Sequence, residues 1–272
     1  MDKQVKPYKT KLDAGNAYWM ARISKEVYAK VSDENSAPDE NLILQRLTDD
    51  DTGFKSVTGF NHKSSQSAVI EHDDYICLAF RGTDEIKDWF DNLNGFATKQ
   101  LFGEFHRGFW DATEDVWVDM MDKLEQCMKE KKRPVFFTGH SLGGAMATVA
   151  ASKFINEDRP FTSVYTFGQP RAVTRDTSRV LNSECKSRYF RFHNNNDIVT
   201  RIPARLMGYS HVGEYFYISE EEEIHRDPGF WFRFVDNVDG IFSSITEEGI
   251  DAFKDHDMSK YLAFVKKWDY QD

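Results

Sequence analysis

The stretch Val135-Phe136-Phe137-Thr138-Gly139-His140-Ser141-Leu142-Gly143-Gly144-Ala145 decides the fold of this chain. An apolar run meets Gly-X-Ser-X-Gly, and small residues continue to position 151. This order predicts a strand, a sharp turn and a helix, with Ser141 at the apex of the turn. The helix N-terminus behind the serine supplies N–H groups and a positive dipole end, which favour a developing oxyanion. A glycine-rich turn without chemistry is the alternative, but the strand before and the helix after it favour a nucleophile.

Composition limits the classes of partner. The 272 residues are 40% hydrophobic, which is enough for a large core, and 45 acidic against 35 basic residues give a formal net charge of −10. This balance argues against a nucleic-acid-binding protein and predicts repulsion from anionic lipid surfaces. No stretch approaches the roughly 20 apolar residues that a transmembrane helix needs.

The chain start and the cysteines bear on the compartment. Residues 1–6 lack the apolar segment of a signal peptide. Cys77, Cys127 and Cys185 show no disulfide-type or metal-type spacing. Both observations favour a reduced, cytoplasmic setting, although a secreted protein whose leader has been removed would look the same. We expect no metal ion and no other cofactor.

Apolar periodicity outlines the secondary structure. Residues 15–30 and the segment from Phe109 to Met128 have helical spacing, whereas 67–70 and 75–80 predict a hairpin. Further strands are expected at 163–167, 189–192 and 215–218, and a last helix within 250–268. Alternating strands and helices predict an α/β fold with a mostly parallel sheet covered on both faces. Without a repeat or a break in composition, residues 1–272 are expected to form one domain.

A serine nucleophile needs a base within hydrogen-bond reach and a third group that holds the tautomer of the base. Asp197 directly follows an apolar strand, at the end where the ligand-binding loops of an open sheet collect. Three asparagines precede it, so a turn-forming aspartate is the alternative. We expect Asp197 to orient the base.

Three histidines follow Asp197, and two of them compete for the role of base, whereas His225 falls in a polar, surface-like segment. His256 lies on a late segment of the kind that folds back over a sheet edge, and Asp255 and Asp257 beside it are expected to stabilise an imidazolium. His211 is the reserve, with the alternative that it is a structural residue pinning a loop. The sequence therefore favours His256.

An oxyanion hole needs two backbone N–H groups. One is expected from Leu142, directly after the nucleophile, and the other from Thr83, which follows a strand end in Phe80-Arg81-Gly82-Thr83. A simple strand-terminating turn is the alternative for the second segment.

The segment after Thr83 has amphipathic helical spacing. Ile86, Trp89, Phe90 and Leu93 fall at i, i+3, i+4 and i+7. Beside an active site, such a short helix acts as a lid that shields apolar surface and opens at a lipid interface. A permanently packed helix anchored by Trp89 is an equally good interpretation. The aromatic run at 230–235 predicts either an acyl-chain pocket or core.

Taken together, these motifs resemble the class 3, fungal-type triacylglycerol lipases of the α/β-hydrolase fold. The similarity includes Phe80–Thr83 as the oxyanion loop, a His-X-Gly-Phe element at 106–109, and the serine turn at 139–145. Later elements match in order at 167–171, 196–199 and 201–203, so the resemblance spans about residues 65 to 260. Unlike many lipases of this family, the chain shows neither a leader nor obvious cysteine pairs.

The resemblance implies a catalytic triad of Ser141, Asp197 and His256, with Thr83 and Leu142 as oxyanion residues. It implies a serine carboxylester hydrolase, foremost a triacylglycerol lipase, acting on acylglycerols or other lipid esters at a lipid–water interface. A phospholipase A1 or a feruloyl-type esterase would use the same machinery. From another class, a non-catalytic lipid-binding relative is the further alternative.

Overall fold

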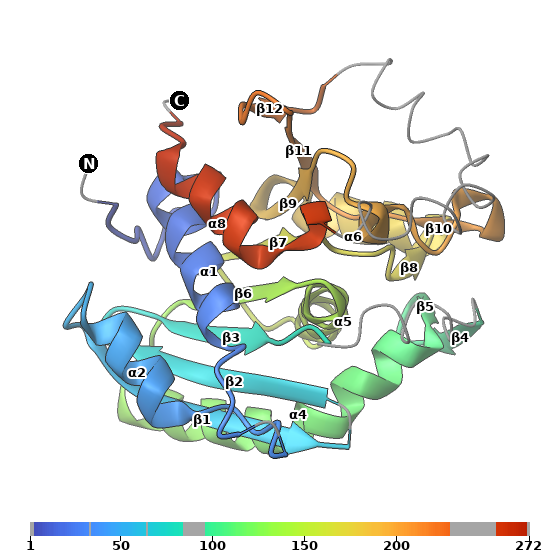
Figure 1. Cartoon of the computed structure of the whole chain (residues 1–272). Helices are drawn as coiled ribbons and strands as arrows, with labels where there is room; N and C mark the ends of the chain where they lie inside the picture. Colours follow the sequence, from blue (N-terminus) through green and yellow to red (C-terminus); the bar gives the residue numbers. More distant parts are fainter. Residues whose placement is uncertain (1–2, 33, 64, 84–95, 229–253, 271–272) are drawn as a thin grey trace.

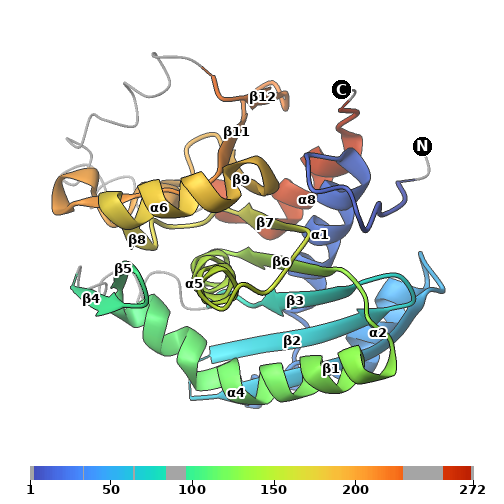
Figure 2. The same ribbon diagram turned by 180° about the vertical axis from the view of Figure 1, so that it is seen from behind.

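A computed structural model describes residues 3–32, 34–63, 65–83, 96–228 and 254–270. The described residues form a large sheet between two layers of helices, with a smaller sheet at one edge (Figures 1 and 2). Outside them lie the expected lid residues Ile86, Trp89, Phe90 and Leu93 and the aromatic run at 230–235. Of the helices in the described ranges, none has the length and apolar character needed to span a bilayer.

The large sheet has eight strands in the order β1-β2-β3-β6-β7-β9-β11-β12. They are β1 (Phe54–His62), β2 (Ser65–His72), β3 (Ile76–Phe80), β6 (Val135–His140), β7 (Ser163–Phe167), β9 (Tyr189–Asn194), β11 (Glu214–Ile218) and β12 (Ile224–Arg226). Strands β3, β6, β7, β9 and β11 run parallel, and the expected hairpin pairs β2 with β3. The predicted mostly parallel sheet is therefore confirmed.

The helices are α1 (Ala14–Glu26), α2 (Glu40–Thr48), α4 (Arg107–Glu130), α5 (Leu142–Asn156), α6 (Arg175–Cys185) and α8 (Met258–Lys267). Helices α4 and α5 cover one face of the sheet, and α1 and α8 cover the other (Figures 1 and 2). Successive side chains of a strand point to opposite faces, so neighbouring residues of β6 enter different cores. Phe137 packs edge-on against Phe154 of α5, whereas Phe136 packs against Tyr75 in the core beneath α1.

Every residue of β6 is buried, which explains why its sequence is a continuous apolar run and not an alternating one. The carboxyl ends of parallel strands meet at one edge of the sheet. The segments that follow β3, β6 and β9 therefore converge, and these segments carry Thr83, Ser141 and Asp197.

The smaller sheet lies beyond this edge and was not expected from the sequence. Its strands are β10 (Tyr209–Ser210), β8 (Val173–Thr174), β5 (Gly103–His106) and β4 (Ala97–Gln100). Short 3-10 helices complete the edge: η2 (Ile198–Arg201), η3 (Arg205–Met207) and η5 (Lys254–His256). Together they frame the carboxyl ends of the central strands.

Candidate active site

Ser141 occupies the sharp turn between β6 and α5. Its backbone has φ 58° and ψ −131°, a conformation that residues other than glycine rarely adopt. The turn is held by its backbone, because the Ser141 N–H donates to the Phe167 carbonyl (2.9 Å) and the Gly144 N–H donates to the Ser141 carbonyl (2.9 Å). The Ser141 side chain is buried, and its Oγ has no hydrogen-bond partner among the described residues. A strained backbone and an unpartnered buried hydroxyl are typical of a functional site.

Close backbone packing explains the glycines of the turn. A Cβ on Gly143 would lie 2.1 Å from the Phe80 carbonyl oxygen, and one on Gly139 would lie 2.3 Å from the Gly143 oxygen. A Cβ on Gly82 would lie 2.9 Å from the Ser141 Cβ. The segment leaving β3 thus rests directly on the serine turn.

This packing also places the two expected oxyanion residues. Leu142 is the first residue of α5, where helix geometry leaves the N–H groups without intrahelical partners. Thr83 is half-buried and directly follows Gly82, the residue that approaches Ser141. The structure brings both segments to the same side of the turn.

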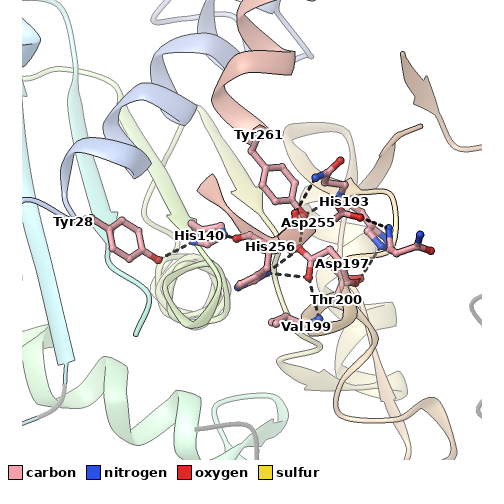
Figure 3. A network of polar contacts seen from close by, with 11 residues as sticks. Tyr28, His140, His193, Asp197, Val199, Thr200, Asp255, His256 and Tyr261 are labelled. Atoms are coloured by element: carbon pink, nitrogen blue, oxygen red, sulfur yellow. Dashed lines mark hydrogen bonds and ion pairs between the residues drawn. The ribbon is translucent and has the colours of Figure 1, made fainter. Parts of the chain in front are cut away.

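Asp197 and His256 form a buried pair (Figure 3). The Nδ1 atom of His256 lies 2.9 Å from Oδ1 and 2.8 Å from Oδ2 of Asp197. A carboxylate on Nδ1 holds the proton there and leaves Nε2 as the basic nitrogen. The Nε2 atom of His256 is buried and has no partner within the described part of the chain. The geometry therefore presents one free basic nitrogen.

The charge of Asp197 follows from its surroundings. Burial by itself raises the pKa of this carboxyl, but attraction to the His256 ring and the hydrogen bond from it outweigh that effect. The pKa of Asp197 consequently lies below its ordinary value, and the group is a carboxylate at neutral pH.

A tyrosine completes the contacts of the carboxylate. The Tyr261 hydroxyl of α8 donates to Oδ2 of Asp197 at 2.5 Å, and the Val199 N–H donates to Oδ1 at 3.0 Å. The Asn194 N–H in turn donates to the Tyr261 hydroxyl at 2.9 Å. Burial, followed by the charge of Asp197, raises the pKa of Tyr261, so the hydroxyl remains a donor. Sequence reasoning missed Tyr261, because its helical spacing resembles that of any core residue.

His140, the variable residue of the Gly-X-Ser-X-Gly motif, holds the segment of the base. Its Nε2 lies 2.8 Å from the His256 carbonyl oxygen, and its Nδ1 lies 2.7 Å from the Tyr28 hydroxyl (Figure 3). Burial and the nearby His256 lower the pKa of His140, so the ring is neutral at pH 7. A neutral ring that donates from Nε2 must accept from the Tyr28 hydroxyl at Nδ1.

The two acidic neighbours of His256 have other partners than expected. Asp255 accepts from the Asn195 amide (3.3 Å) and pairs with Lys260 (3.0 Å), while Asp257 caps α8 through the Ser259 N–H (2.8 Å). The turn and the helix cap engage both carboxylates, and their stabilising effect on an imidazolium stays a prediction. Asp255 thereby fastens the segment of His256 to Asn195, which directly follows β9.

His211, the reserve base, pins the loop that follows Asp197. Its Nε2 donates to the Thr200 carbonyl at 2.8 Å, and the Thr200 hydroxyl donates to the Asp197 carbonyl at 2.9 Å. His193 lies 3.0 Å from the same hydroxyl. Burial lowers the pKa of His211, and the charges of Arg191 and Arg171 lower it further. These contacts agree with the structural alternative for His211.

Comparisons with known proteins point in one direction. The family model described as "Lipase (class 3)" matches residues 77–207. The chain is 28% identical over 158 residues to a secreted mono- and diacylglycerol lipase of Penicillium cyclopium, covering 56% of this chain and 50% of that protein. It is 32% identical over 149 residues to one of Fusarium solani, covering 53% and 44%. The chain thus spans about half the length of the curated relatives it matches.

A likeness in fold extends further than the likeness in sequence. The solved triacylglyceride lipase of Rhizomucor miehei superimposes with a TM-score of 0.64, covering 78% of this chain and 82% of that one at 21% identity. This similarity confirms the predicted fold class. The cytoplasmic setting, in contrast, finds no support, because the Penicillium and Fusarium relatives are named as secreted proteins.

Proposed function

We propose that this chain is a serine carboxylester hydrolase acting on acylglycerols. The chain belongs to the class 3 lipase family. One observation carries the proposal: Ser141 and His256 each present a buried, unpartnered polar atom, and Asp197 fixes the histidine. The nucleophile, the orienting carboxylate and the base follow one another along the chain in the order found in α/β-hydrolases.

The proposed reaction runs through an acyl-enzyme. Oγ of Ser141 attacks the ester carbonyl carbon while Nε2 of His256 takes its proton, and Asp197 stabilises the resulting imidazolium. The N–H groups of Leu142 and Thr83 donate to the oxyanion. When the tetrahedral intermediate collapses, His256 protonates the departing alcohol. Water, deprotonated by His256, then attacks the acyl group, releases the fatty acid and restores the Ser141 hydroxyl.

The names of the relatives support a substrate with an acylglycerol ester, as they are mono- and diacylglycerol lipases or triacylglycerol lipases. A triacylglycerol lipase is our first proposal, with Ile86, Trp89, Phe90 and Leu93 as lid and substrate-contacting residues. A phospholipase A1 and a feruloyl-type esterase are the enzymatic alternatives, and a non-catalytic lipid-binding protein is the alternative from another class.

Hydrolysis rates test the proposal. We expect wild-type protein to hydrolyse p-nitrophenyl butyrate, p-nitrophenyl palmitate and a triolein emulsion, and the Ser141→Ala variant to lose all three activities. A preference for phosphatidylcholine or a feruloyl ester would favour one of the alternative esterases. Full activity of Ser141→Ala would contradict the assignment of the nucleophile.

Two further expectations concern the whole protein. The site uses residues from Tyr28 to Tyr261, so we propose that residues 1–272 act as one α/β-hydrolase domain. Calorimetric unfolding should then be a single two-state transition. The names of the relatives support secretion over a cytoplasmic location. Detection of the protein in the culture medium of its source, and not in the lysate, would test this.

A further inference from the structure

A cavity of about 470 Å³ lies beside the small sheet, between α6, η3 and the segment after β10. Three arginines line it, Arg175 and Arg179 from α6 and Arg205 from η3. We call it the arginine cavity. Three guanidinium groups around one cavity favour a ligand with phosphate or carboxylate oxygens.

The hydrogen bonds of the two α6 arginines engage only some of their N–H donors. Arg175 donates to the Arg205 carbonyl at 2.7 Å through one of its five N–H groups. Arg179 pairs with Asp176 at 2.7 Å, but the two side chains are 78% and 90% exposed. An ion pair this exposed is worth little and yields readily to a stronger anionic partner.

The wall of the cavity also contains an unpartnered acceptor. His211 donates from Nε2 to the Thr200 carbonyl, and its buried Nδ1 has no partner in the described ranges. A neutral imidazole that donates from Nε2 carries a lone pair on Nδ1, which calls for a hydroxyl or water donor.

Exposed apolar side chains lie at both ends of the small sheet, and one of them, Leu206, lines the cavity. Leu206 and Met207 of η3 are 82% and 53% exposed, and Phe96 and Leu101 at the β4–β5 end of the small sheet are 66% and 41% exposed. These are four of the eight large apolar side chains that the described part of the chain exposes. Both views place η3 and the β4–β5 hairpin beyond the carboxyl ends of the central strands, the edge of the Ser141 turn (Figures 1 and 2). We call this surface, with the arginine cavity, the docking edge.

We propose that the docking edge binds an anionic lipid surface, with a headgroup phosphate in the arginine cavity and Leu206 and Met207 in the apolar boundary. A protein of net charge −10 is repelled by such a surface in most orientations. One orientation is favourable, because it brings local cations and exposed apolar groups to the lipid. In this orientation Ser141 faces the lipid. The value of this orientation for catalysis rests on the proposed function, whereas the binding itself does not.

Vesicle co-sedimentation tests the proposal with Ser141→Ala protein, which leaves the lipids intact. We expect stronger binding to vesicles of phosphatidylcholine and phosphatidylglycerol (4:1) than to phosphatidylcholine alone. Adding Arg175→Gln and Arg179→Gln to this protein should weaken binding to the anionic vesicles about 25-fold, because each cation removed should weaken it about five-fold. The matched control, Lys129→Gln in the last turn of α4 with Lys132→Gln just after that helix, removes the same charge and should bind as before.

A second pair of variants tests the apolar contribution. Leu206→Ser should weaken binding to the anionic vesicles about ten-fold. Val118→Ser removes another exposed apolar side chain, 67% exposed in the middle of α4 and not among the residues that define the docking edge, and should have no effect.

Equal binding to both vesicle types, or full binding by the double arginine variant, would overturn the proposal. The proposal would also be overturned if calorimetry showed that the arginine cavity binds glycerol phosphate while the protein does not bind vesicles. Activity on soluble p-nitrophenyl butyrate separates this proposal from the enzymatic one. With Ser141 intact, the arginine variants should still hydrolyse p-nitrophenyl butyrate. If wild-type protein did not hydrolyse this ester, only the proposed function would be contradicted.

Discussion

The Ser141 turn and the Asp197–His256 pair are built in opposite ways. The turn comes from eleven contiguous residues, and backbone hydrogen bonds and glycine contacts fix it. The pair joins residues 59 positions apart. It is held by the side chains of Tyr28 after α1, His140 of β6 and Tyr261 of α8, and by one backbone N–H of β9. The position of the proposed nucleophile is therefore a backbone property, whereas that of the proposed base depends on a network of individual hydrogen bonds.

The largest expected effect treats both regions as one unit. His256→Ala should lower kcat on p-nitrophenyl butyrate about a million-fold, as much as Ser141→Ala, because neither group acts without the other. The double variant should be no slower than either single variant. Additive losses in the double variant would show that the two residues work independently.

Asp197→Asn should cost less, about ten-thousand-fold in kcat. The amide keeps the shape of the side chain but favours the wrong tautomer of His256 and does not stabilise an imidazolium. Circular dichroism should show an unchanged fold. A loss below ten-fold with an intact fold would contradict the role of Asp197.

Gly143→Ala tests the backbone side of the comparison. The added methyl group would lie 2.1 Å from the Phe80 carbonyl, so the turn must shift, at a cost of about 3 kcal/mol in the free energy of unfolding. Gly108→Ala is the control, since its methyl group would only touch the His106 ring at 3.4 Å. Urea denaturation of both variants measures the difference, and equal stability would refute close packing at Gly143.

Tyr261→Phe tests the side-chain network. Removing the hydroxyl at 2.5 Å from Asp197 should lower kcat about ten-fold and leave KM nearly unchanged, because one hydrogen bond to the charged carboxylate is lost. Tyr75→Phe is the matched control, a buried tyrosine whose hydroxyl has no partner in the described part of the structure. Losing the Tyr261 hydroxyl should also shift the acid limb of the pH–rate profile, whereas a change in packing alone would not.

The smallest effect concerns pH and stability. The pKa values of His140 and His211 lie below that of an unfolded histidine, so the unfolded chain binds more protons below about pH 6.5. Stability is therefore full above that pH and falls as the pH drops, by about 1 kcal/mol per unit for each ring. His140→Gln and His211→Gln should each reduce this slope between pH 6.5 and 5 in urea titrations. An unchanged slope in both would contradict neutral buried rings.

The same contrast explains what the sequence could predict. The strand, turn and helix around Ser141 carry their signal in one short stretch, as do the β2–β3 hairpin and α4. The sequence favoured His256 over His211, and the structure pairs His256 with Asp197. Tyr261 and His140 escaped notice because only the folded chain brings them to the pair.

The short strands and helices could not be predicted from the sequence for a different reason. The strands of the small sheet have two to four residues, too few for an alternating pattern to stand out. Helix α2 spans nine residues, and the signal that could have located it is Asp39, whose side chain accepts from the Leu42 N–H at the helix start. Their stability comes from tertiary contacts, which a local pattern does not record.

Labelling with a fluorophosphonate probe tests whether Ser141, Asp197 and His256 form one catalytic unit, because the probe needs both an activated serine and its base. Peptide mass spectrometry of wild-type protein should find the adduct on Ser141 alone, and Ser141→Ala and His256→Ala should both abolish it. A folded wild-type protein that stays unlabelled, or that is labelled at another residue, would contradict the assignment of Ser141, Asp197 and His256 as one catalytic unit.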